Sequence, residues 1–147
     1  MNASAICIMC FPQLAILYPV VCSFCACVYL CEQIRRNNGK WEWAEYSTFS
    51  ISSGARKYKL KVSGHSGNAV DSLRKAGSFS ANNMKFSTPD QDNDECPCKC
   101  AVKRESGWWF NWCSAGYLNR DGLTVWSTNG QGFNVKMTRM LLKFKQA

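Results

Sequence analysis

The ten cysteines of this chain fall into two groups, and their placement restricts the fold more than any other feature. Six lie in the first 31 residues, four lie between residues 96 and 113, and the stretch between the groups has none. In an oxidising, secretory environment, a small loop-rich module uses such a late cluster as covalent staples. The chain has 147 residues, which is one domain at most. We therefore expect a disulfide-stabilised domain in the secretory pathway.

The early group lies in an apolar segment, residues 5–31, that contains no charged side chain. A helix of this length would measure roughly 40 Å, enough to cross a bilayer core of about 30 Å. Residues 1–31 are therefore predicted to be a signal peptide, cleaved near Ser23–Ala26, or a signal anchor that holds the chain on a membrane. Cleavage is favoured, although Arg35 and Arg36 conflict with export under the positive-inside rule. Residues 32–40 are predicted to be a polar junction.

Two alternating runs after the junction are predicted to form a pair of strands. Residues 44–51 alternate polar and apolar side chains, and residues 57–64 place Tyr58, Leu60 and Val62 on one face with lysines on the other. Such alternation is typical of a half-buried strand, and the short SSGAR connection favours a hairpin.

Weaker signals follow along the chain. Residues 63–68 are predicted to form a turn, and residues 68–76 a short helix with Asn68 at its N-cap. Residues 123–126 and 133–144 are predicted to be closing strands, the second with Phe133, Val135 and Met137 on one face. The pattern indicates short strands, few helices and long loops. The aromatic run GWWFNWC is expected to serve mainly as core and loop scaffold.

Three aspartates alternate in the irregular stretch FSTPDQDNDECPCKC, residues 86–100. Neighbouring carboxylates without a nearby base repel one another unless a cation neutralises them, and Ca²⁺ accepts about six to eight oxygens in flexible geometry. An EF-hand is excluded because its sixth and twelfth positions, counted from Asp90, hold Glu95 and Ala101. Spacing alone leaves two readings open, a Ca²⁺ loop and a solvated Asn/Asp-rich turn.

The late cysteines also allow two readings. A four-thiolate zinc site has poor spacing here, because structural zinc sites prefer about two to four residues between paired ligands and only one separates Cys96, Cys98 and Cys100. A disulfide is favoured in the secretory pathway. A loop closed by Cys100 and Cys113 would gain roughly 3 kcal/mol in the chain-entropy picture.

Charge and composition exclude other classes of function. The net charge is +8, but Lys and Arg are scattered singly or in pairs, whereas a nucleic-acid binder clusters them. The chain shows no Ser/His/Asp arrangement and no convincing acid–base pair, so catalysis is not expected. The single histidine, His65, is interpreted as a solvated turn residue.

Three motifs together resemble a known family. S-G-x-x-G-N-A-x-D-S-L spans residues 63–73, F-S-T-x-D-x-D-N-D spans 86–94, and G-W-W spans 107–109. This order resembles the C-terminal half of the fibrinogen-related domain, over about residues 40–145. The resemblance implies an α+β fold with short antiparallel strands, few short helices and long calcium-binding loops. It also implies a partial domain, residues 41–147, that lacks the N-terminal half of the module.

The resemblance assigns roles by position. It implies Ca²⁺ ligands at the carboxylates of Asp92 and Asp94 and at the backbone carbonyls of Cys96 and Cys98, and a disulfide between Cys100 and Cys113. A pocket beside the metal, which binds acetyl groups of sugars or amines in lectin-like members, is expected near a cis peptide at Trp112–Cys113. Its expected ligand-binding residues are Trp112, Cys113, Ser114, Ala115 and Tyr117.

Three departures qualify that assignment. Ser114 stands where sugar-binding members have histidine, the loop after Asn119 is shortened, and Cys96 and Cys98 are additional cysteines that pair with each other or between chains. The expected function is a secreted or membrane-tethered module, monomeric or oligomeric, that binds glycan, acetylated or extracellular protein ligands in innate defence or adhesion. The alternatives are a structural matrix protein without sugar binding and a truncated product with no independent function.

Overall fold

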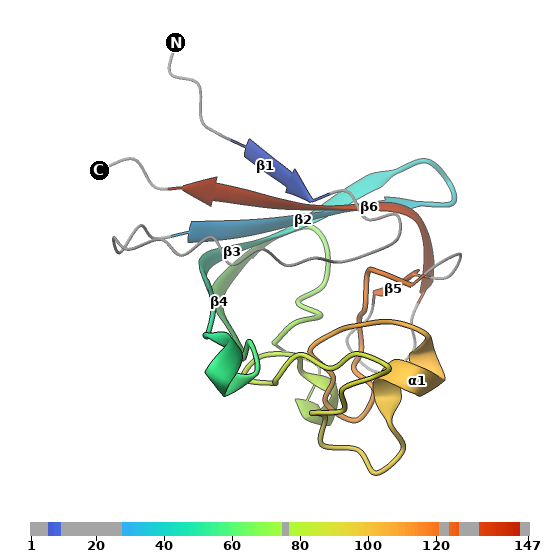
Figure 1. Ribbon diagram of the computed structural model, residues 1–147. Helices are drawn as coiled ribbons and strands as arrows, with labels where there is room; N and C mark the ends of the chain where they lie inside the picture. Colours follow the sequence, from blue (N-terminus) through green and yellow to red (C-terminus); the bar gives the residue numbers. More distant parts are fainter. Residues whose placement is uncertain (1–5, 10–27, 75–76, 121–123, 127–132, 145–147) are drawn as a thin grey trace.

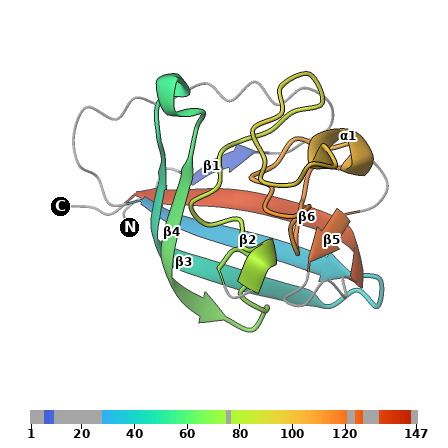
Figure 2. The same cartoon turned by 90° about the horizontal axis from the view of Figure 1, so that it is seen from below.

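The computed structural model describes residues 6–9, 28–74, 77–120, 124–126 and 133–144. One antiparallel sheet forms one layer, and long loops with short helices form a second layer against one of its faces (Figures 1 and 2). The sheet order is β1-β6-β2-β3-β4, and β5 also pairs with β6. The strands are β1 (Ile6–Met9), β2 (Val28–Arg36), β3 (Trp41–Ile51), β4 (Leu60–Gly67), β5 (Thr124–Trp126) and β6 (Phe133–Phe144). The helices are η1 (Gly54–Arg56), η2 (Gly77–Phe79) and α1 (Cys100–Arg104).

Strand β2 lies between β3 and β6 and pairs with both. Leu30 and Ile34 alternate on its buried face, so residues 32–36 are part of a central strand and not a polar junction. The predicted start of the folded domain at residue 41 is therefore wrong. The strand was missed because its buried face carries the charged residue Glu32 between Leu30 and Ile34, so the sequence pattern resembles a polar segment.

The apolar segment 5–31 is described only at its two ends. Residues 6–9 form β1, which pairs with β6, and residues 28–31 begin β2. Residues 10–27 lie outside the described residues, so their role as signal peptide or anchor stays a prediction. Within the described ranges, no helix has the length and apolar character needed to cross a membrane.

The predicted hairpin is confirmed as β3 and β4, which pair antiparallel on either side of η1. Leu60 and Val62 are buried as expected, but Tyr58 precedes the strand in a left-handed conformation with φ 51°. Residues 63–67 belong to β4, so the predicted turn there is wrong.

The predicted helix over residues 68–76 is also wrong, because the described part forms turns. The side chain of Asn68 caps no helix. Its Oδ1 accepts a hydrogen bond from the backbone N–H of Trp43 at 2.8 Å, which ties the end of β4 to the start of β3.

The closing strands are confirmed as β5 and β6, but β3 and β6 have 11 and 12 residues and are not short. Val135 is buried and Met137 is exposed, so they do not share a face. The register shifts between Arg35, which pairs with Met137, and Arg36, which pairs with Val135. Such a bulge inserts one extra residue and turns the following side chains to the other face.

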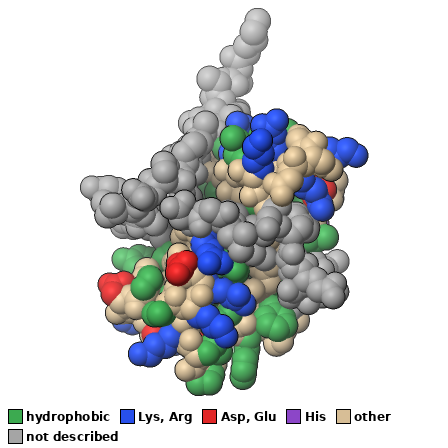
Figure 3. Space-filling model, turned by 90° about the vertical axis from the view of Figure 1, so that its right-hand side faces the viewer, with side chains coloured by type: hydrophobic (Ala, Val, Ile, Leu, Met, Phe, Trp, Pro, Cys, Tyr) green, Lys and Arg blue, Asp and Glu red, His purple; other side chains and the backbone are tan. Residues whose placement is uncertain are grey.

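The core lies between the inner face of the sheet and the loop layer. The sheet contributes Leu30, Ile34, Tyr46, Leu60 and, from β5, Trp126, and the loops contribute the large aromatic side chains of Trp108 and Phe110. The face shown in Figure 3 carries Lys and Arg side chains in separate groups, among apolar and polar ones. This view agrees with the scattered basic residues of the sequence.

Candidate functional site

Two loops of the second layer are joined covalently beside α1. A disulfide links Cys100, the first residue of α1, to Cys113 of the aromatic loop, which we define as residues 107–117. This is the pairing that the resemblance implied. A second disulfide joins Cys96 to Cys98, so the two additional cysteines pair within the chain. The aspartate loop, residues 86–99 directly before α1, is thus held beside the aromatic loop by the Cys100–Cys113 bond.

The carboxylate of Asp94 organises the turn that leads into α1. One of its oxygens accepts a hydrogen bond from the backbone N–H of Cys96 at 2.7 Å, and the other accepts one from the N–H of Cys100 at 2.8 Å. Asp92 in turn accepts a hydrogen bond from the N–H of Asp94 at 3.2 Å. Burial raises the pKa of Asp94, the two N–H donors oppose that shift, and the neighbouring Asp92 carboxyl raises the pKa further. The two carboxyl groups therefore lie close together.

This donor set fits a hard cation. Two adjacent carboxylates and the backbone carbonyls of an irregular turn are the oxygen ligands that Ca²⁺ prefers. Asp90 has a different environment, because it is fully exposed and its hydrogen bond with Thr88 lowers its pKa. Asp92 and Asp94 are joined by a hydrogen bond, whereas Asp90 bonds to Thr88; the calcium ligands implied by the resemblance stay a prediction.

The five predicted ligand-binding residues lie together on the aromatic loop, but their exposure differs. Trp112 is 53% exposed, while Cys113, Ser114, Ala115 and Tyr117 are each at most 6% exposed. Only Trp112 therefore presents a large accessible surface to a ligand.

The turn at Trp112 is built from left-handed residues. Trp112, Cys113 and Ser114 have φ values of 46°, 62° and 47°, and no described peptide bond is cis. The cis bond expected at Trp112–Cys113 is therefore wrong, since consecutive left-handed residues make the turn instead. Each such residue costs roughly 1–2 kcal/mol, so the surroundings must hold this conformation.

Ser114 supplies that restraint. Its hydroxyl donates to the carbonyl of Trp109 and accepts from the N–H of Asn111, both at 3.1 Å, and its own N–H donates to the carbonyl of Asn111 at 2.9 Å. Ser114, where the resemblance led us to expect histidine in sugar-binding members, is thus a buried support of the loop.

The other aromatic side chains of the loop are scaffold, as predicted. Trp109 donates from its indole N–H to the carbonyl of Tyr58 at 2.8 Å and packs edge-on against Phe86 and Trp108. These contacts fasten the aromatic loop to the connection between β3 and β4.

Sequence reasoning missed an acidic group in the core. Glu32 is fully buried, and neither of its carboxylate oxygens has a hydrogen-bond partner among the described residues. Burial raises its pKa well above the ordinary value of 4.5, and the charge of Asp71 raises it further. Asp71 is also buried, and it accepts a hydrogen bond from the Tyr46 hydroxyl at 3.1 Å. The only available signal was alternation, which puts residue 32 on the same face as Leu30 and Ile34.

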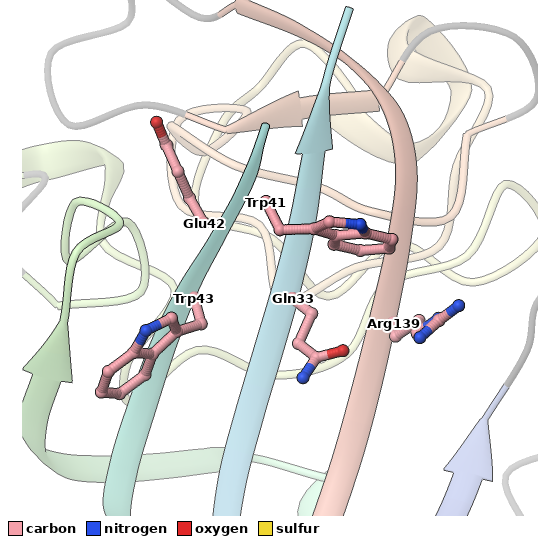
Figure 4. A pocket seen from close by; sticks show the side chains of 5 residues that line it. All are labelled: Gln33, Trp41, Glu42, Trp43 and Arg139. Atoms are coloured by element: carbon pink, nitrogen blue, oxygen red, sulfur yellow. The ribbon is translucent and has the colours of Figure 1, made fainter. Parts of the chain in front are cut away.

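The outer face of the sheet carries an aromatic and cationic group that the sequence analysis also missed. Trp41 and Trp43 are 40% and 41% exposed, and the guanidinium carbon of Arg139 lies 4.8 Å from the centre of the Trp41 ring. With Gln33 and Glu42 these side chains line a shallow pocket of about 230 Å³ (Figure 4). Glu42 is engaged in an ion pair with Arg36 at 2.6 Å.

Comparison with known proteins finds relatives of similar sequence among the angiopoietins. Angiopoietin-4 of Bos taurus is 32% identical over 117 residues, which cover 71% of this chain and 23% of the relative. Angiopoietin-related protein 7 of Mus musculus is 32% identical over 117 residues, covering 71% of this chain and 34% of the relative. The chain thus spans between about a quarter and a third of the length of these relatives.

Solved structures share the fold. The fibrinogen-like globe domain of human ANGPTL6 matches 82% of this chain and 58% of its own, with a TM-score of 0.71 and 24% identity. The lamprey fibrin D-dimer, solved with the peptide ligand Gly-His-Arg-Pro-amide, matches 79% of this chain and 45% of its own, with a TM-score of 0.73 and 26% identity.

The family model described as the C-terminal globular domain of fibrinogen beta and gamma chains matches residues 26–144. The match begins earlier than the resemblance at about residue 40, in agreement with the central position of β2. The chain belongs to the fibrinogen-related family.

Proposed function

We propose that this chain is a calcium-stabilised, non-enzymatic recognition module that acts outside the cell on protein ligands. The observation that carries the proposal is the pair of adjacent carboxylates, Asp92 and Asp94, on a loop joined by a disulfide to the loop that exposes Trp112. The matched angiopoietins and the peptide-bound lamprey fibrin favour protein ligands. An acetyl-binding pocket is less favoured, because Ser114, Ala115 and Tyr117 are buried.

The proposed Ca²⁺ would be held by the carboxylates of Asp92 and Asp94 and by the carbonyls of Cys96 and Cys98. When bound, it would neutralise the repulsion between the two carboxylates. Asp94 already holds the turn through its two backbone hydrogen bonds. The disulfide connects this turn to Cys113. Ser114 in turn holds the left-handed turn that exposes Trp112. A metal here would thus stabilise the loop that contacts the ligand.

Calcium is expected to raise the melting temperature of the oxidised chain. A ligand that binds only the folded state stabilises it by about 2.7 kcal/mol at a hundred times its Kd. The double variant Asp92→Asn/Asp94→Asn should lose this calcium-dependent rise, while Asp90→Asn, a matched change in the same loop, should keep it. Thermal melts with Ca²⁺ and with chelator measure the difference. A wild-type melt that is equal in both buffers, or an equal loss in Asp90→Asn, would contradict the calcium site.

Ligand class can be tested with arrays of extracellular protein ectodomains and of glycans, both probed with the labelled chain in Ca²⁺. We expect binding to protein targets that Trp112→Ala weakens at least about tenfold, because exposed aromatic side chains dominate interface energetics. Lys103→Ala on α1 is a surface control and should bind like the wild type. Binding to acetylated glycans alone would favour the lectin reading. Silence on both arrays would overturn recognition and favour a structural matrix role.

A further inference from the structure

The four late cysteines form a single cluster of sulfur atoms. The Sγ atoms of Cys96, Cys98, Cys100 and Cys113 all lie within 4.8 Å of one another. They are paired as two disulfides, yet the Cys98 sulfur lies 3.4 Å from the Cys113 sulfur and 3.9 Å from the Cys100 sulfur. The two disulfides are therefore in contact, and Cys98 lies against both sulfurs of the other bond.

The backbone around the cluster is restrained by contacts other than the disulfides. Asp94 binds the N–H groups of Cys96 and Cys100, one before and one after Cys98. Ser114 restrains the left-handed turn that contains Cys113. The backbone at three of the four cysteines is thus held by hydrogen bonds that do not involve the sulfurs.

The separations suit a tetrahedral thiolate site. Zinc–sulfur bonds of about 2.3 Å place the four sulfurs of such a site roughly 3.8 Å apart, close to the non-bonded separations of 3.4 and 3.9 Å. The backbone N–H of Cys98 also lies 3.3 Å from the Cys96 sulfur, to which it donates, and such hydrogen bonds orient and tune metal-bound ligands. We infer that the four cysteines bind one Zn²⁺ when both disulfides are reduced.

The chemistry balances with a dithiol as the reductant. Two equivalents of dithiol reduce the two disulfides to four thiols and become two oxidised dithiols. Zn²⁺ then displaces four protons, and the resulting site has a net charge of about −2 because each thiolate carries one negative charge. Lys99 precedes Cys100, and Lys103 and Arg104 lie in the last turn of α1. These basic residues, close to Cys100 in the sequence, would partly neutralise the negative charge of the site. The sulfur site differs from the proposed calcium site, which uses carboxylate and carbonyl oxygens.

The observed positions of the sulfurs outweigh the spacing argument against zinc. The one-residue spacing of Cys96, Cys98 and Cys100 is tighter than structural zinc sites prefer, yet the fold already brings these sulfurs together with that of Cys113, 13 residues beyond Cys100. Tertiary contacts bring the four sulfur atoms together, which the one-residue spacing alone does not predict.

Cobalt and zinc titrations of the full chain test the inference. The reduced chain should bind one tight equivalent of Zn²⁺ by chelator competition, and Co²⁺ should give the intense thiolate charge-transfer absorption of a tetrahedral sulfur site. Cys98→Ser should weaken the tight equivalent by more than about a hundredfold. Cys31→Ser, which replaces a free cysteine outside the cluster, is the matched control and should bind like the wild type. The oxidised chain should show no thiolate–cobalt absorption.

Three results would overturn the inference. One is the absence of a tight equivalent in the reduced wild type, and another is equal affinity in Cys98→Ser and Cys31→Ser, which would indicate binding by other cysteines. The third, obtained on the wild-type chain alone, is an X-ray absorption spectrum of the zinc-loaded form with fewer than four sulfur neighbours. This last measurement does not depend on whether a variant folds.

Discussion

Replacing Glu32 with leucine is expected to raise the free energy of unfolding by roughly 1–3 kcal/mol at about pH 7. Glu32 is fully buried with both carboxylate oxygens unpartnered among the described residues, and an unsatisfied buried polar group costs about that much. Leucine is similar in size and removes the polar atoms without leaving a large cavity. Urea denaturation of wild type and variant measures the difference. Glu45→Leu, on the other face of the same sheet, is the control and should not stabilise the chain.

The same residue predicts how stability depends on pH. The pKa of Glu32 is raised in the folded state by burial and by Asp71. The full stability is therefore present below the ordinary value of 4.5 and is lost as the pH rises toward the folded-state pKa, because only the unfolded chain gives up the proton. The slope reaches at most about 1.4 kcal/mol per pH unit. Glu32→Gln should remove this part of the slope, and identical pH profiles in wild type and variant would contradict the assignment.

Truncating Trp109 to alanine should destabilise the chain by about 3–5 kcal/mol, the usual cost of removing a buried aromatic side chain. The variant also leaves the Tyr58 carbonyl without its indole donor and removes the edge-on contacts with Phe86 and Trp108. Trp112→Ala is a matched control three residues away. Because Trp112 is 53% exposed, that change should shift stability by less than about 0.5 kcal/mol.

Guanidinium denaturation followed by far-ultraviolet circular dichroism measures both variants under oxidising conditions. Similar losses in the two variants would mean that the aromatic loop does not depend on Trp109 for its attachment to the connection between β3 and β4. A large effect of Trp112→Ala alone would mean that the left-handed turn is held by that side chain instead of by Ser114.

Local patterns in the sequence were sufficient for part of the fold. The hairpin of β3 and β4 and the closing strands β5 and β6 were predicted because alternation of side chains is a property of neighbouring residues. The Cys100–Cys113 pairing and the selection of Asp92 and Asp94 depended on motif resemblance, since spacing alone left alternatives open. The family itself was recognisable because its motifs are runs of adjacent residues.

Tertiary structure decided the rest, because the forces involved act between residues far apart in sequence. Strand β2 is central only because β3 and β6 flank it, and that placement buries Glu32 beside Asp71. The bulge opposite Arg35 and Arg36 turns Met137 outward, which periodicity within β6 does not reveal. The sequence alone determined which cysteines are close along the chain, but only packing of the turn, α1 and the aromatic loop placed four sulfurs within 4.8 Å. The alternation of side chains along a strand is a local property that the sequence shows directly. Which face is buried, and in which register the strand pairs, depends on the partner strand.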